Sequence, residues 1–160
     1  MTTLPLNTTD ITCDDCLLNH QGAYYVTIRV TNGAGLFTLT TTDEIRVDLT
    51  APLIGNVIPV SDVTQCVSNC TLAANVTFFK YEESGVKSCR YAIRNSTHFI
   101  TDFVNKGLEK TLEAKDLQLV AGERYYVIVK CENNAGLVTE KASIIPVLVD
   151  DTPPAKVSKT

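Results

Sequence analysis

Apolar and polar residues alternate strictly from Tyr125 to Cys131, with Tyr125, Val127, Val129 and Cys131 on one parity. A period of two is typical of a β-strand that buries one face. Residues 133–136 supply the Asn and Gly of a turn, and residues 142–149 predict a second strand. That strand ends at the linker Asp-Asp-Thr-Pro-Pro of residues 150–154. The pattern therefore predicts a strand, a turn, a second strand and a proline linker.

The same pattern occurs earlier in the chain, where residues 24–30 and 36–47 predict two strands around a turn at residues 32–35. The matched positions are Tyr24 and Tyr125, Asn32 and Asn133, and Gly35 and Gly136, each 101 residues apart. The linker at residues 47–52 matches residues 149–154 at an offset of 102, so one extra residue falls between Gly35 and Asp48. A repeat of about a hundred residues has the length of a β-sandwich domain and is too long for a solenoid. We therefore expect a piece of a tandem array.

The second copy predicts about seven strands between Leu53 and Val149 and no periodic helix. Its expected elements are strands at 53–60, 72–78 and around Cys89, Tyr91 and Ile93, a loop at 61–70, a short strand around Phe99, Ile100 and Phe103, an edge strand at 111–117, and the closing hairpin. This count is that of an immunoglobulin-like sandwich. The expected fold class is all-β, with one complete domain preceded by the C-terminal part of another.

The domain boundaries follow from this pattern. Residues 1–48 form the end of an incomplete repeat, residues 49–150 a complete domain, and residues 151–160 a linker and the start of a following repeat. Two or three strands cannot bury a two-sheet core, so residues 1–48 need a complement. Either the native chain continues beyond this segment, or a neighbouring molecule donates strands.

A family resemblance rests on the spacing Leu119-x-Ala121-x-Glu123-x-Tyr125-x-Val127-x-Val129-x-Cys131-x-Asn133-x-x-Gly136, which stands again between Leu18 and Gly35. It resembles the signature of fibronectin type III domains. The resemblance implies that Tyr24 and Tyr125 are tyrosine-corner residues, and that Phe78 or Phe79 occupies the place of the usual Trp. The elements around Gly85, Gly136 and the proline linker resemble tandem repeats of very large extracellular proteins.

Composition and charge exclude other classes. The chain has 160 residues, 44% apolar and 20% charged, which is ordinary globular composition. The net charge is −4 and no basic stripe is present, so we expect no nucleic-acid partner. No apolar run reaches the roughly 20 residues of a membrane span. Residues 1–5 lack the basic start and apolar core of a signal peptide, so any export signal is expected outside this segment.

Cysteines and glycosylation motifs indicate an extracellular or cell-surface location. Four sequons begin at Asn7, Asn69, Asn75 and Asn95. Six cysteines in a β-rich chain favour an oxidising compartment. Cys89 and Cys131 are expected to pair because both face inward on strands that the fold places side by side. Cys13 with Cys16, and Cys66 with Cys70, are expected local pairs, although six cysteines allow 15 connectivities and a four-thiolate zinc site is the other interpretation.

Other chemistry is expected to be structural. Asp48, Asp150 and Asp151 sit at domain junctions, and we expect them close to Glu82 and Glu83, where they either cap turns or hold calcium. Ser96, His98 and Asp102 are neighbours in one expected loop, without the elbow of a nucleophilic serine. We expect no enzymatic activity, no cofactor and no resident metal.

The sequence therefore predicts an extracellular structural or adhesive spacer in a tandem β-sandwich array, with assembly into a fibre as a further expectation. Its expected partners are neighbouring repeats of the same protein and homotypic or matrix protein contacts. A ligand-binding receptor ectodomain and a non-catalytic accessory domain of a secreted enzyme are the alternatives.

Overall fold

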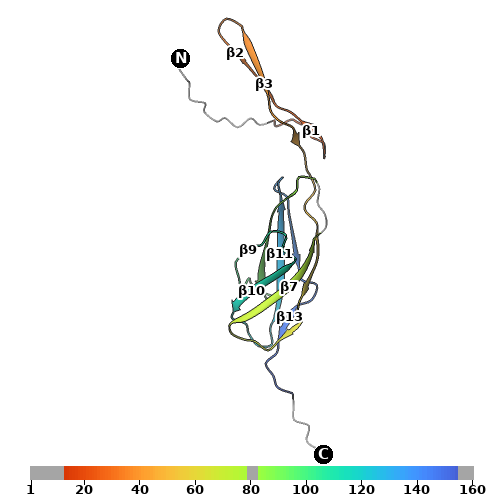
Figure 1. Cartoon of the computed structure of the whole chain (residues 1–160), viewed down its shortest axis with the longest axis vertical. Helices are drawn as coiled ribbons and strands as arrows, with labels where there is room; N and C mark the ends of the chain where they lie inside the picture. The colour runs from red at the N-terminus through yellow and green to blue at the C-terminus, as the bar shows by residue number, and fades with distance from the viewer. Residues whose placement is uncertain (1–12, 79–82, 155–160) are drawn as a thin grey trace, which may run out of the picture. The chain divides into compact units, whose positions relative to one another are not determined.

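A computed structural model describes residues 13–78 and 83–154 of the chain, in two compact units, residues 1–47 and residues 48–160. Within these described ranges every regular element is a β-strand (Figure 1). The described part of the chain holds no helix with the length and apolarity to cross a membrane. The expected all-β, Ig-like class is confirmed.

The first unit contains two short antiparallel pairs. Strand β1 (Ala23–Tyr24) pairs with β4 (Ile45–Arg46), and β2 (Thr27–Thr31) pairs with β3 (Phe37–Thr41) as a ribbon (Figure 1). The turn between β2 and β3 places Gly35 at φ 80°, a left-handed conformation that favours glycine. Every residue of β2 and β3 is exposed, and none of the described residues of this unit, 13–47, is buried.

The second unit is a two-layered sandwich. One sheet has the order β10-β7-β5, formed by β5 (Ile54–Pro59), β7 (Cys70–Phe78) and β10 (Thr111–Leu117). The other is built on β11 (Arg124–Asn133), with β8 (Val86–Arg94) and β9 (Val104–Asn105) on one side, and β12 (Val138–Ala142) and β13 (Val147–Val149) on the other. All these pairs are antiparallel. The short strand β6 (Val63–Thr64) adds to β13 in parallel.

The core lies between the two sheets and follows the alternation of the sequence. Tyr125, Val127, Val129 and Cys131 are all buried, as the period of two along this strand predicted. The facing sheet contributes the buried side chains of Val57, Leu72, Ala74, Val76, Leu112, Ala114 and Leu117. The hydroxyl of Tyr91 on β8 donates to the carbonyl of Glu113 on β10, which joins the two sheets through a hydrogen bond.

Several predicted boundaries are wrong. The strand expected at 142–149 is two strands, because β12 begins at Val138 and the ladder is interrupted before β13. Pro146 lies in that interruption and has no N–H for a ladder bond. The strand expected at 36–47 is likewise divided into β3 and β4, and that at 24–30 into β1 and β2.

Two further differences concern the loops. The predicted loop at 61–70 contains β6. The short strand expected around Phe99 is instead β9 at Val104–Asn105, and Phe99 forms an isolated bridge with Arg94. Phe78 is half-buried against the core, and Phe79, the other expected substitute for Trp, lies outside the described residues.

Candidate functional site

The carboxylate of Asp48 lies where the linker enters the sandwich and accepts several hydrogen bonds. Asp48 is only 7% exposed. Its Oδ1 accepts from the Thr50 backbone N–H at 2.9 Å, and its Oδ2 accepts from the Asn133 side-chain amide at 2.9 Å. The backbone N–H and the hydroxyl of Ser84 also donate to Oδ2. We call Asp48 with Thr50, Ser84 and Asn133 the Asp48 socket.

Asn133 connects this socket to the closing turn of the sandwich. Its side chain is fully buried at the end of β11. The Nδ2 donates to Asp48 and to the carbonyl of Thr50, both at 2.9 Å, and the Oδ1 accepts from the backbone N–H of Leu137 at 2.8 Å. Among side chains, only those of Asn and Gln carry two N–H donors and a carbonyl acceptor at one end. Asn133 therefore holds the linker and the β11–β12 turn together.

Burying a carboxylate is costly unless hydrogen bonds replace water. Bonds from N–H and O–H groups to an ionised carboxylate are the stronger kind, and the Asp48 socket supplies several of them. The donors around Asp48 match its negative charge and anchor the linker by hydrogen bonds.

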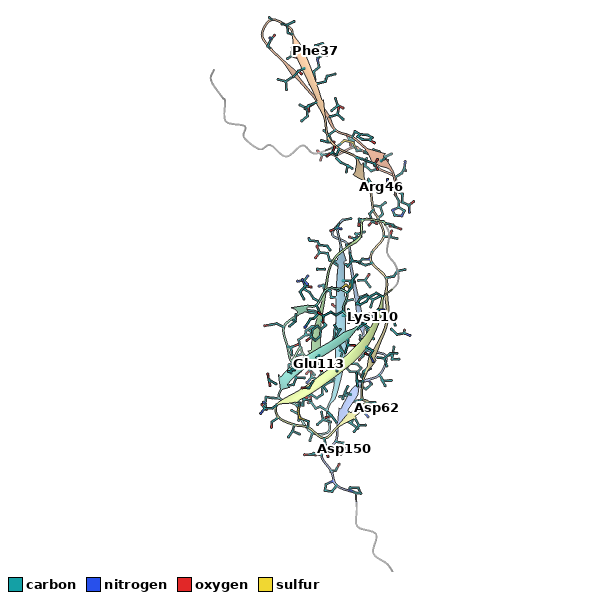
Figure 2. The ribbon with its side chains drawn as sticks, viewed as in Figure 1. Phe37, Arg46, Asp62, Lys110, Glu113 and Asp150 are labelled. Atoms are coloured by element: carbon teal, nitrogen blue, oxygen red, sulfur yellow. A yellow bond between two sulfur atoms is a disulfide. The ribbon has the colours of Figure 1, made fainter. Side chains whose placement is uncertain are left out.

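The second linker carboxylate, Asp150, lies at the other end of the sandwich. The backbone N–H of Asp150 donates to the Thr64 carbonyl at 2.9 Å, and Figure 2 shows Asp150 at the same end as Asp62. The strand β11 runs between the two ends and spans about 30 Å. The expectation that Asp48, Asp150 and Asp151 cluster near one turn is therefore wrong. Glu83 lies near Asp48, because the Thr50 hydroxyl donates to both carboxylates, and Glu82 lies outside the described residues.

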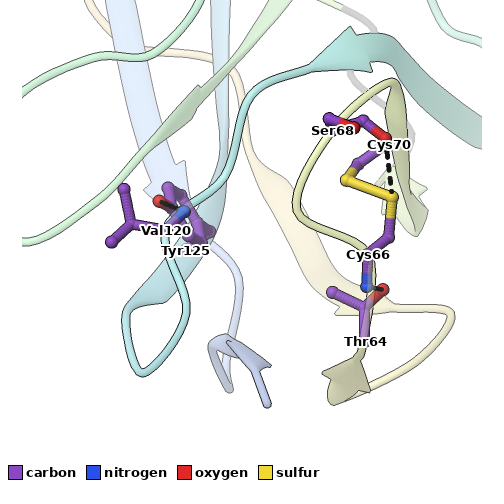
Figure 3. Close-up of a disulfide and its surroundings, with 6 residues drawn as sticks. All are labelled: Thr64, Cys66, Ser68, Cys70, Val120 and Tyr125. Carbon is purple, nitrogen blue, oxygen red and sulfur yellow. Dashed lines mark hydrogen bonds between the residues drawn. A yellow bond between two sulfur atoms is a disulfide. The ribbon is translucent and has the colours of Figure 1, made fainter. Parts of the chain in front are cut away.

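The two tyrosines that the repeat brings into register make the same bond. The phenol oxygen of Tyr24 accepts from the backbone N–H of Asn19 at 2.8 Å, and that of Tyr125 accepts from Val120 at 2.9 Å (Figure 3). In both cases the partner lies five residues upstream. This is the geometry that the resemblance to fibronectin type III domains implied for a tyrosine corner.

The structure joins the cysteines in the three expected pairs: Cys13–Cys16, Cys66–Cys70 and Cys89–Cys131. Cys89 and Cys131 are directly opposite on neighbouring strands β8 and β11, and both are buried. The Cys66–Cys70 bridge closes the loop that leads into β7 (Figure 3). With all six sulfurs in disulfides, the four-thiolate zinc interpretation is wrong.

The structure separates the sequons by accessibility. Asn69 and Asn75 are exposed, and Asn7 lies outside the described residues. Asn95 is 5% exposed, and its amide donates to Glu123 at 2.9 Å. Its Oδ1 accepts from the backbone N–H groups of Thr97 and His98, so this side chain organises its own loop.

That loop borders two shallow depressions over β8 and β11, about 370 and 310 Å³ in volume. Both are lined by Ser96 and Tyr126; Glu123 and Arg124 line one, and Arg94 the other. Near them the His98 ring pairs with the Thr97 hydroxyl at 2.9 Å. The first depression combines the Tyr126 ring with both signs of charge, which suits a small polar ligand. The second has one charge, Arg94, beside the apolar side chains of Ile128 and Ala142.

The sequence analysis identified Asp48 and Asn133 but not the hydrogen bond between them. Asn133 was expected to be structural, and Asp48 was expected to cap a turn or hold calcium; Ser84 was not singled out. The available signal was that the Asp of each linker and the Asn of each turn recur together. Their meeting depends on residues 85 positions apart in the chain.

The fold and the site define the second unit as an immunoglobulin-like β-sandwich module with an anchored linker. Neither a protein-family profile nor a curated protein matches the chain. Among solved structures, the chain is similar to the extracellular region of rat CD45, domains d3-d4. The TM-score is 0.43 at 10% identity, over 89% of this chain and 79% of that one.

Proposed function

We propose that this chain is a spacer segment of an extracellular array of tandem Ig-like, fibronectin type III-like sandwiches. In this arrangement residues 1–48 close one domain, residues 49–150 form the next, and residues 151–160 lead into a third. The function is mechanical: each sandwich is a stiff spacer, and the proline linkers limit bending because proline restricts its own φ and the residue before it.

The observation that supports this proposal is a set of hydrogen bonds within the first unit that occurs again, at corresponding positions, within the second. In the first unit the Gln21 N–H donates to the Val47 carbonyl at 2.7 Å; in the second the Gly122 N–H donates to Val149 at 2.7 Å. The N–H groups of Val47 and Val149 donate back to Gly22 and Glu123, at 3.1 and 3.0 Å.

The correspondence extends along the hairpins. The N–H of Val26 donates to the Thr42 hydroxyl at 3.1 Å, as the N–H of Val127 donates to Ser143 at 3.3 Å. The pairing Thr27↔Thr41 matches Ile128↔Ala142, at an offset of 101. The pairing Tyr24↔Ile45 matches Tyr125↔Val147, at offsets of 101 and 102. When the two hairpins are aligned by these registers, the one extra residue of the second copy falls between Ser143 and Val147.

The extracellular location is supported by chemistry that this compartment permits. The three disulfides require oxidising conditions to persist. Two exposed sequons, at Asn69 and Asn75, are available to glycosylation in a secreted chain. Adhesion and fibre assembly would follow from homotypic or matrix contacts of such an array.

Single-molecule stretching of the chain between its ends tests the mechanical role. A spacer domain should resist force and then open in one step. The Cys89–Cys131 disulfide prevents the residues between the two cysteines from extending under force. Opening of the domain should therefore release about 20 nm of chain when the disulfide is intact and about 35 nm when it is reduced. Smooth extension without a rupture step in the oxidised protein would contradict the proposal.

The ligand-binding ectodomain is the second candidate, and the depressions beside Tyr126 favour it. The two candidates differ in what the complete coding sequence should contain. An array predicts further copies of the Tyr-Tyr-Val and Asn-x-Ala-Gly-Leu unit on both sides, whereas a receptor predicts a membrane span downstream.

A further inference from the structure

The two linkers have the same local conformation. The Thr50 N–H donates to the Asp48 carboxylate at 2.9 Å, and the Thr152 N–H donates to the Asp150 carboxylate at 3.0 Å. In each linker the threonine hydroxyl bonds to the same carboxylate oxygen as its N–H. A Val directly precedes each Asp, and a Pro stands four residues after each Asp.

The two carboxylates differ in what surrounds them. Asp48 is buried in a socket made by Ser84 and Asn133 of the domain that follows it in the chain. Asp150 is exposed, and the domain that would follow it begins beyond the linker. The aspartate of the first linker is thus held by donors of the domain that follows it in the chain.

The Asp150 carboxylate has the charge and the local conformation to accept hydrogen bonds from donors like those around Asp48. The Thr152 hydroxyl and backbone N–H lower the pKa of Asp150, so it remains an anion at neutral pH. Its geometry is already set by these bonds, which reduces the conformational entropy lost on docking. A matching partner must offer N–H and O–H donors in the arrangement that Ser84 and Asn133 show around Asp48.

We infer that Asp150 and Thr152 form a docking segment for a following β-sandwich, whose serine turn and strand-end asparagine donate to the Asp150 carboxylate. This inference rests on the proposed tandem array. The first unit carries the corresponding asparagine, Asn32, whose Oδ1 accepts from Leu36 at 3.0 Å as Asn133 accepts from Leu137. Asn32 is exposed and would receive the aspartate of a linker that precedes it.

The test extends the chain by one domain. Residues 53–154 are added directly after Pro154, so that Pro154 takes the place of Pro52 and Asp150 takes the place of Asp48. The protein has no tryptophan, so a Trp at the Tyr126 position of the added copy reports on that copy alone. Urea unfolding of the added copy is followed by the fluorescence of this Trp. Unfolding of the unextended chain is followed by circular dichroism.

Asp150→Ala in the extended chain is expected to raise the unfolding equilibrium constant of the added copy by about 10- to 100-fold, the usual effect of losing bonds to a charged group. Asp48→Ala should do the same to the second unit of the unextended chain. Asp151→Ala is the matched control, because Asp151 takes the place of the exposed Leu49 and should have no effect. Asp150→Ala in the unextended chain should leave the second unit unchanged.

The outcomes separate this inference from the array itself. If the added copy folds but Asp150→Ala and Asp151→Ala behave alike, the docking inference is overturned and the array stands. A control chain joins the added copy through a second copy of residues 48–52 in place of 150–154. Folding through that linker alone also overturns the inference. If the added copy folds through neither linker, the sandwich is no autonomous repeat and the proposed function fails as well.

Discussion

The phenol oxygen of Tyr125 accepts a hydrogen bond from the backbone N–H of Val120, at 2.9 Å. The bond ties the segment before β11 to the strand itself, and the Tyr125 ring is buried at 1% exposure. Tyr24 makes the equivalent bond to Asn19, although its ring is only half-buried. The bond is therefore local, and it forms whether or not a complete core surrounds it.

Replacing Tyr125 by Phe should lower the free energy of unfolding of the second unit by about 1–2 kcal/mol. The ring remains, but the Val120 N–H loses its acceptor, and an unpaired backbone donor costs about this much. Urea unfolding followed by circular dichroism measures it. Tyr126→Phe is the matched control, since its ring lies on the outer face, and it should change stability by less than about 0.5 kcal/mol. Equal effects of the two substitutions would contradict the role of the Tyr125 hydroxyl.

Stability should fall at alkaline pH. Burial raises the pKa of Tyr125 and of Tyr91 above 10.0. The negative charge of Glu123 raises the pKa of Tyr125 further, and that of Glu109 raises the pKa of Tyr91. The folded state then holds the phenol protons more tightly than the unfolded state does. This contribution is intact below pH 10 and is lost as the pH rises through the folded-state values.

The measurement is the free energy of unfolding between pH 8 and about 11, the range that brackets tyrosine ionisation. The double variant Tyr91→Phe, Tyr125→Phe should show a flatter profile than the wild type. Tyr126→Phe should retain the wild-type slope. A double variant with an unchanged slope would show that other groups cause the alkaline loss.

Removing the Cys89–Cys131 bridge should destabilise the second unit by about 4 kcal/mol, because it closes a loop of some 42 residues in the unfolded chain. Cys89→Ala with Cys131→Val is a suitable pair, since Val30 stands at the position of Cys131 in the first unit. Removing Cys66–Cys70, which closes a much shorter loop, should cost only about 2 kcal/mol. A larger loss from the short loop would show that chain entropy is not the main contribution of these bridges.

Asn95 and Asn75 should differ both as glycan acceptors and in stability. Asn95→Ala removes the bonds to Glu123, Thr97 and His98 and should cost about 1–3 kcal/mol, whereas Asn75→Ala on the exposed face of β7 should be nearly neutral. In protein from a secretory host, glycopeptide mass spectrometry should find Asn75 more fully occupied than Asn95. Full occupancy at Asn95 in folded protein would contradict the buried position of its amide.

Periodicity was sufficient where one face of a strand is buried. The edge strand predicted at 111–117 is β10, and the parity predicted for Tyr125 to Cys131 is the buried one. It was insufficient where partners lie outside the strand. The break between β12 and β13 arises because Ser143 bonds to Val127 while the next residue, Ile144, donates to Val57 of the other sheet. An alternation of residue types contains no information about a change of partner sheet.

The same limit explains the Asp48 socket. Asp48, Ser84 and Asn133 are distant in the chain and belong to a linker, a turn and a strand end. The repeat marked Asn133 as structural because it recurs at Asn32, but not which group its amide serves. The partner of a buried polar group depends on three-dimensional proximity, which spacing within one segment does not report.

Local alternation and turn residues were enough to establish the all-β class and the strand parity, because both depend on short-range patterns. Which hairpin is buried became clear only from the packing of the sheets. Val30 is 59% exposed and Cys131 is 1% exposed, although both occupy the same position of the same hairpin. The facing sheet of β5, β7 and β10 makes this difference, because burial is a property of what packs against a strand.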